Sequence, residues 1–165
     1  MQNTIFALAT GNQIAALSVI RVSGEDCERI LKKLTLKNTP KERILTLRNF
    51  YFPKSNKKLI DNCLVVWMPA PRSYTGEDCI EIYSHGGDAV FQGFFSALTS
   101  FHNVRYAEQG EFSKRAIING KTDLVKAEAV NDLINSATEK QRELAIRQFN
   151  KGLSIPIMKW RKEII

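Results

Sequence analysis

The clearest pattern in the chain is the alternation of residues 79–84, which predicts a β-strand with Glu81 and Tyr83 on one side and two isoleucines on the other. The polar residues 73–78 before it predict a turn, and the glycine-rich residues 85–87 predict a second turn that opens a helix. An ionised carboxylate facing a core is costly unless it is paired. Glu81 therefore either faces water or lies in a pocket that supplies partners.

Alternation and helical spacing predict further elements on both sides of this strand. A helix is expected to follow Ser23 as its N-cap, and others to begin at Asp88 and Thr122. Thr138 and Gln141 match a capping box for the last helix. Short strands in runs beside packed helices indicate the α+β class, with a mixed or antiparallel sheet. The expected strands cover 4–10, 17–22, 43–52, 59–68 and 103–107, and the continuously apolar 63–68 predicts a central position in the sheet.

The last helical pattern carries a long apolar seam that a bundle or coiled-coil partner would use. Pro156 is expected to kink or break it. The pattern is unfinished at Ile165, which suggests a piece of a longer protein. The seam consists of Ile146, Phe149, Leu153, Ile157, Trp160 and Ile164.

Length and composition agree with one ordinary globular domain. The chain has 165 residues, of which 44% are hydrophobic and 25% charged. No apolar run approaches the roughly 18 residues of a membrane span, and the N-terminus lacks signal-peptide features. Three widely spaced cysteines fit reduced thiols, so a soluble cytoplasmic protein without a membrane partner is expected. The net charge of +7 favours a polyanion, although a solvated basic surface explains it equally well.

Several kinds of chemistry have no support in the sequence. There is no phosphate-binding loop of the GxxxxGKS or GxGxxG type, so the chain is not expected to hydrolyse GTP. The two histidines, His85 and His102, form no recognisable triad, and His85 is expected to serve a turn or packing role. The glycine turn before Asp88 could hold an anion, but a plain backbone turn is favoured.

Four blocks, in order along nearly the whole chain, resemble the N-terminal domain of the MnmE (TrmE) family of tRNA-modifying GTPases. The resemblance implies a fold similar to the tetrahydrofolate-binding domain of aminomethyltransferases, with a folate-binding and dimerisation domain over 1–120. Residues 121–165 would then begin a helical domain. The blocks are IRVSG from Ile20, SYTGEDCIEIYSHGG from Ser73, GEFSKRA from Gly110, and NGKTDL from Asn119 followed by AEA from Ala127.

The resemblance also assigns a cofactor site. Arg21, Glu81 and Lys121 fall on the family's folate-contacting positions, and the ligand would be a 5-formyl- or 5,10-methylene-tetrahydrofolate. Glu81 suits the adjacent N–H donors of a pterin, while Arg21 and Lys121 suit its carbonyl groups and glutamate tail. Glu111 and Arg115 either form an ion pair that holds the pocket loop or contact the ligand. No catalytic residue and no metal ligand is expected in this chain.

The implied partners are a second copy of the chain, the flavoprotein MnmG (GidA) and tRNA, for modification of the wobble uridine. K⁺ and Mg²⁺ would act with GTP only in a GTPase domain that this chain does not contain. Residues 10–15 depart from the family's proline- and glycine-rich loop, which puts contacts from that loop in doubt. Two alternatives stay open: an RNA-binding or scaffold module that does not bind folate, and a small aminomethyl-transfer enzyme supported by fold analogy alone.

Overall fold

The computed structural model describes residues 3–11, 15–53, 58–151, 160 and 163. It divides into two compact units, 1–112 and 113–165, and the division falls inside the helix α3 (Glu111–Ile118). The expected boundary at 120/121 lies a few residues further along the chain.

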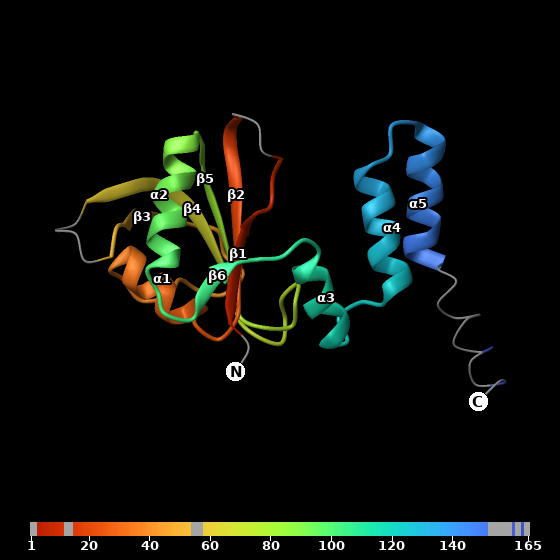
Figure 1. Ribbon diagram of the computed structural model, residues 1–165, viewed down its shortest axis with the longest axis horizontal. Helices are drawn as coiled ribbons and strands as arrows, with labels where there is room; N and C mark the ends of the chain where they lie inside the picture. Colours follow the sequence, from red (N-terminus) through yellow and green to blue (C-terminus); the bar gives the residue numbers. More distant parts are fainter. Residues whose placement is uncertain (1–2, 12–14, 54–57, 152–159, 161–162, 164–165) are drawn as a thin grey trace. The chain divides into compact units, whose positions relative to one another are not determined.

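The first unit is built on one mixed sheet whose strand order is β3-β4-β5-β2-β1-β6 (Figure 1). Neighbouring strands are antiparallel except β1 and β6, which run parallel. Together with the helices, this sheet confirms the predicted α+β class. The strands are β1 (Thr4–Leu8), β2 (Ala15–Ser23), β3 (Thr46–Tyr51), β4 (Leu59–Met68), β5 (Cys79–Gly86) and β6 (Val104–Tyr106).

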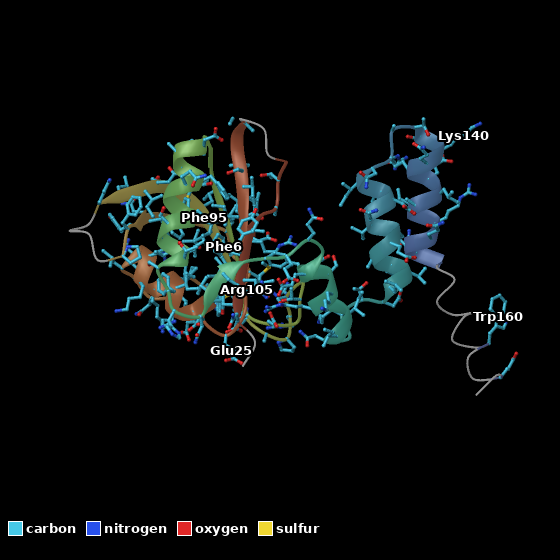
Figure 2. All side chains as sticks on the ribbon, viewed as in Figure 1. Phe6, Glu25, Phe95, Arg105, Lys140 and Trp160 are labelled. Carbon is cyan, nitrogen blue, oxygen red and sulfur yellow. The ribbon has the colours of Figure 1, made fainter. Side chains whose placement is uncertain are left out.

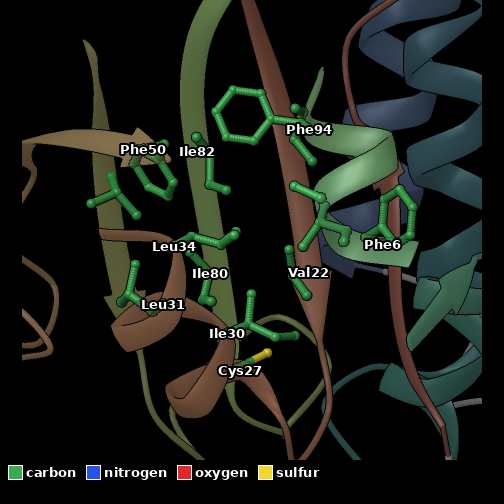
Figure 3. Packing of buried hydrophobic residues seen from close by; sticks show 14 of the residues in the cluster. Phe6, Val22, Cys27, Ile30, Leu31, Leu34, Phe50, Ile80, Ile82 and Phe94 are labelled. Carbon is green, nitrogen blue, oxygen red and sulfur yellow. The ribbon is translucent and has the colours of Figure 1, made fainter. Parts of the chain in front are cut away.

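Two helices, α1 (Cys27–Thr35) and α2 (Asp88–Thr99), pack on one face of this sheet (Figure 1). The face is apolar because directly opposed residues of β1, β2, β5 and β4 all contribute hydrophobic side chains to it. Burial of this continuous apolar surface is the main term that stabilises the unit. Its fully buried large side chains include Phe6, Ile20, Val22, Ile30, Leu31, Leu34, Phe50, Ile80, Ile82, Phe94 and Leu98 (Figure 3).

An aromatic stripe on α2 packs against the sheet. The rings of Phe94 and Phe50 meet edge to face with their centroids 5.4 Å apart. The rings of Phe95 and Phe6 make a second such pair at 5.6 Å (Figure 2). These contacts fix α2 against β3, at one edge of the sheet, and β1, the strand next to the other edge.

The start of α1 differs from the prediction. Asp26, and not Ser23, occupies the N-cap position, while the fully buried Ser23 is the last residue of β2. The helix ends at Thr35 because Leu36 takes a left-handed conformation with φ of 54°.

Two strands also differ from expectation. β4 has the predicted bounds, but its residues alternate in burial and Leu64 is 37% exposed, since only one face of the sheet carries α1 and α2. β5 continues through the predicted turn as far as Gly86. Gly86 pairs with Ala15, and a Cβ built on it would lie 2.4 Å from the Ala15 carbonyl oxygen, so a glycine is required there.

The second unit contains the rest of α3, followed by α4 (Leu124–Ile134) and α5 (Glu139–Lys151). Asp123, and not the predicted Thr122, caps α4 by accepting a hydrogen bond from the Lys126 amide at 2.9 Å. The capping box of α5 is confirmed: Thr138 Oγ1 accepts from the Gln141 amide, and Gln141 Oε1 accepts from the Thr138 amide.

The apolar seam of the last helix can be followed only in part. Ile146 is half-buried and Phe149 is 43% exposed, and Trp160 is 57% exposed. Pro156 and the seam residues Leu153, Ile157 and Ile164 lie outside the described residues, so the predicted kink stays a prediction.

The three cysteines are free thiols and all are buried, as small apolar side chains would be. Burial, with the nearby Asp61 carboxylate as a smaller cause, raises the pKa of Cys63 to about 12. None of the helices in the described part of the chain is both long and apolar enough to cross a lipid bilayer.

Candidate functional site

The second face of the sheet, which points away from α1 and α2, brings together two of the three predicted site residues. Arg21 on β2 stands directly opposite Glu81 on β5. Arg21 Nε donates to Glu81 Oε1 at 2.8 Å, and Nη2 lies 2.7 Å from the same oxygen. The two side chains are 25% and 16% exposed. Of the two alternatives for Glu81, the structure shows a partly enclosed carboxylate with partners.

The other carboxylate oxygen of Glu81 has its own donor. The Tyr83 hydroxyl, two residues along the same strand, donates to Glu81 Oε2 at 2.9 Å. Burial raises the pKa of Tyr83, and the hydrogen bond to Glu81 and the negative charge of that carboxylate raise it further. Both oxygens of Glu81 are thus engaged from within the sheet.

Two aromatic rings lie beside the guanidinium of Arg21. Its central carbon is 4.6 Å from the centroid of the Tyr74 ring and 5.8 Å from that of the Phe112 ring. Tyr74 belongs to the loop between β4 and β5, and Phe112 follows the loop after β6. The charge pair is therefore framed by one side chain from a loop and one from the first turn of α3, which are distant in sequence.

Buried polar contacts anchor the loop that carries Tyr74. Ser23 Oγ donates to Glu77 Oε2 at 2.7 Å and shares a hydrogen bond of 2.7 Å with the Thr75 hydroxyl. At the other end of the loop, Asp78 Oδ1 accepts from the Ala70 amide at 2.8 Å. Ser23, expected to cap a helix, instead ties the end of β2 to the site loop.

An ion pair anchors the first turn of α3, which carries Phe112. Arg105 on β6 donates from both terminal nitrogens to Glu111, at 2.8 and 2.7 Å. The Glu111 side chain is only 11% exposed, and the hydrogen bonds to Glu111 raise the pKa of Arg105. An ion pair between Glu111 and Arg115 stays a prediction from the sequence motif, and Arg105 lies outside that motif. Arg115 is itself buried and belongs to the second unit.

Lys121, the third predicted site residue, lies in the second unit just after α3. Its backbone amide donates to the Ala116 carbonyl at 2.8 Å and the preceding Gly120 has a φ of 65°, so a turn fixes its backbone. Its side chain is exposed. Its assignment to the folate site stays a prediction from the resemblance.

His85 does more than the expected turn or packing role. Its imidazole Nδ1 lies 2.8 Å from Oδ1 of the buried Asp61, and its amide donates to Asp61 Oδ2 at 3.0 Å. The His85 side chain is nonetheless 71% exposed. The sequence signal for this pair was an aspartate inside a largely apolar strand, and it was not recognised.

The arrangement is suited to binding rather than to covalent chemistry. In the described part of the chain, Nη1 of Arg21 makes no hydrogen bond, so its two N–H groups can serve a ligand. Glu81 Oε2 keeps one lone pair beyond the bond from Tyr83. No group of three or more histidine, cysteine or acidic residues that could hold a metal occurs among these residues. The fold and the site define a small α+β domain. One face of its sheet carries a charge pair whose remaining hydrogen-bonding groups are available to a ligand.

Comparison with known families agrees with this class. The family model described as the N-terminus of the GTP-binding protein TrmE matches residues 4–121. The chain belongs to this family. The matched segment contains Arg21, Glu81 and Lys121, together with Tyr74 and Phe112.

Individual relatives match almost the whole chain. A tRNA modification GTPase MnmE of Rhodopseudomonas palustris is 46% identical over 98% of this chain and 35% of its own length. A mitochondrial 5-taurinomethyluridine-tRNA synthase subunit of Mus musculus is 44% identical over 98% of this chain and 33% of its own length. A mitochondrial tRNA modification GTPase of Dictyostelium discoideum is 37% identical over the full chain and 33% of its own length. The chain thus spans about a third of the length of these relatives.

Proposed function

We propose that the chain binds a tetrahydrofolate one-carbon donor at the Arg21–Glu81 pair. The observation that carries the proposal is a part-buried charge pair with free hydrogen-bonding capacity on both members. A charge pair that served stability alone would gain most from having every donor satisfied. Here two N–H groups of Arg21 stay available in the middle of a sheet face.

The chemistry of a pterin fits this capacity. One of its N–H groups donates to the lone pair that Glu81 Oε2 keeps, and Arg21 Nη1 donates to its carbonyl oxygen. Because Arg21 and Glu81 touch one another, both act on the same end of an elongated ligand. The glutamate tail is then assigned to Lys121, as the resemblance implies.

The test is titration of the purified chain with 5-formyltetrahydrofolate by calorimetry, repeated with Arg21→Ala and Glu81→Ala. We expect binding by the unmodified chain and a loss of roughly tenfold or more in each variant, since each removes hydrogen bonds to a charged group. Lys32→Ala and Glu28→Ala are the matched controls, because they break an exposed pair of similar length, 2.7 Å, on α1. Failure of the folded, unmodified chain to bind would reject the proposal.

We further propose that the chain forms a homodimer. Support comes from apolar side chains on the same sheet face, where Leu47 on β3 stands opposite Leu64 on β4. They are 56% and 37% exposed. Light scattering should give the mass of two chains, and Leu47→Asp should shift it toward one. Arg48→Asp on the same strand is the control for added charge, and a monomer at high concentration would contradict the dimer.

The names of the relatives suggest the wider process. We propose that the chain supplies the folate-binding part of a tRNA-modifying system that acts on the wobble uridine in the cytoplasm, together with tRNA and an MnmG-type flavoprotein. GTP hydrolysis, with its K⁺ and Mg²⁺, would belong to a separate GTPase domain. Co-purification of the chain with such a flavoprotein and tRNA, compared between wild type and Leu47→Asp, tests this assignment.

An RNA-binding or scaffold module without folate is the second candidate, and the distribution of charge favours it. Residues 113–165 contain eleven lysines and arginines against six acidic residues. Steep weakening of tRNA binding with added salt, combined with no measurable folate binding, would select this candidate.

A further inference from the structure

Tyr83 is the one direct partner of Glu81 to which neither the family resemblance nor the proposed function gives a role. We propose that Tyr83 is a positioning residue: its hydroxyl holds the Glu81 carboxylate in the orientation in which the remaining lone pair of Oε2 receives an N–H donor of the ligand. The inference rests on the proposed folate function and adds a specificity-determining residue to the same site.

The geometry of β5 places the Tyr83 hydroxyl within hydrogen-bonding distance of Glu81. Residues 81 and 83 are two apart on β5 and therefore lie on the same face of the sheet. The bond from Tyr83 to Glu81 Oε2 is 2.9 Å long and part-buried. It is the only hydrogen bond that the Tyr83 side chain makes in the described part of the chain. Val19 and Leu64, the residues directly opposite Tyr83, are apolar and offer the hydroxyl no other partner.

The hydrogen bond from Tyr83 matters because Arg21 holds only one oxygen of the Glu81 carboxylate. Arg21 contacts only Oε1, through both Nε and Nη2. A carboxylate held through one oxygen can still turn about its terminal torsion, which is broad for glutamate. The bond from Tyr83 fixes the second oxygen and hence the plane of the carboxylate. The direction in which the remaining lone pair of Oε2 points, and hence its bond to an N–H group of the ligand, depends on that plane.

Tyr83 keeps this bond over the whole neutral range. Burial and the Glu81 carboxylate both raise its pKa, so the hydroxyl stays protonated and remains a donor. Deprotonation would place a phenolate beside a carboxylate in a partly enclosed site. The contact is therefore one that pH does not release under the conditions in which a folate would bind.

The experiment compares 5-formyltetrahydrofolate binding by the unmodified chain, Tyr83→Phe, Glu81→Gln and the double variant. Tyr83→Phe keeps the ring and removes only the hydroxyl, and we expect a roughly tenfold loss of affinity. In the Glu81→Gln background the same change should have a clearly smaller effect, because the negatively charged acceptor is gone and only a neutral amide remains. Tyr51→Phe is the matched control, since it removes a hydroxyl whose described partner is Asn49 on β3.

A second readout needs no ligand. In an ultraviolet titration of tyrosinate, one tyrosine of the unmodified chain should titrate later than the others. That late step should vanish in Tyr83→Phe and move to lower pH in Glu81→Gln.

The outcomes separate this inference from the function it rests on. No folate binding by the unmodified chain would overturn both together. Binding by the unmodified chain with unchanged affinity in Tyr83→Phe would overturn the inference alone. Tighter binding of 5-formyltetrahydrofolate by Tyr83→Phe would show that the hydroxyl competes with the ligand. If Tyr83→Phe lost the same affinity in the presence and absence of the Glu81 carboxylate, the loss would be a general packing effect. Either result would also reject the positioning role.

Discussion

The two compact units of this chain are built in different ways. In 1–112 a sheet and two helices enclose a continuous set of buried aliphatic and aromatic side chains. The described helices α4 and α5 of 113–165 bury little beyond Ala129 and Ala145. Their large apolar residues stay exposed, among them Leu124 at 62%, Ile134 at 76% and Leu144 at 57%.

Charge follows the same division. Residues 1–112 contain thirteen basic and eleven acidic residues, which nearly balance, whereas eleven basic and six acidic residues give 113–165 most of the net +7. The sheet unit has the features of a self-supporting domain, since burial of apolar surface is the main source of stability. The helical unit instead depends on local devices such as its caps. This contrast predicts where substitutions will be costly.

The largest effect is expected in the core of the sheet unit. Phe94 is fully buried and packs edge to face on Phe50. Phe94→Ala should lower the free energy of unfolding by about 3–5 kcal/mol, as the loss of a buried aromatic ring typically does. Urea denaturation followed by circular dichroism measures this. A loss below about 1 kcal/mol would mean that the core is looser than the structure indicates.

A smaller and local effect is expected in the helical unit. Thr138→Ala removes the hydroxyl that accepts from the Gln141 amide and should destabilise the start of α5 by about 1 kcal/mol. Hydrogen exchange should then speed up at the α5 amides while those of β2 and β5 stay unchanged. Equal acceleration in both places would contradict the separation of the two units.

Tyr83 should make the stability of the protein depend on pH in the alkaline range. Because the folded-state pKa of Tyr83 is raised, the unfolded chain loses this proton first as the pH rises past the ordinary tyrosine value of about 10. Stability from the protonated hydroxyl is thus complete below that value and is lost as the pH rises through the folded pKa. Denaturation midpoints measured between neutral pH and this range should fall less steeply in Tyr83→Phe than in the unmodified chain.

The smallest effect is expected at an exposed apolar position of α5. Leu144 is 57% exposed, so Leu144→Ser should change the free energy of unfolding by less than about 0.5 kcal/mol. Denaturation alongside Phe94→Ala provides the comparison. A loss close to that of Phe94→Ala would show that this face of α5 is covered in solution.

Local signals predicted local structure well. The alternation around Glu81 gave the strand, the bounds of β4 were correct, and the Thr138–Gln141 spacing gave the capping box. Each of these depends on residues within a few positions of one another. The prediction for the β5 end failed at Gly86, where the deciding contact comes from Ala15 on another strand.

The surroundings of the site could not be predicted in the same way. Arg21 and Glu81 were named through the resemblance, but their direct contact follows from the β2–β5 register. The Ser23–Thr75 bond, the Arg105–Glu111 pair and the rings of Tyr74 and Phe112 all join segments that are close only in the folded chain. A polar residue can pair with many others along the sequence. Which of them it contacts is decided only when the sheet has formed.

The parallel pairing of β1 with β6 means that β1 cannot complete its backbone hydrogen bonds until β6 has been synthesised. Thr4 lies beside Val104, so about a hundred further residues must leave the ribosome after β1 before the outer edge of that strand is covered. Until then a nascent chain presents that edge, with its unpaired amides and carbonyls, to any neighbouring polypeptide. A ribosome that stalls ahead of residue 104 would therefore release an intermediate prone to aggregation, and a chaperone holding the N-terminal strand would be of most use during this interval.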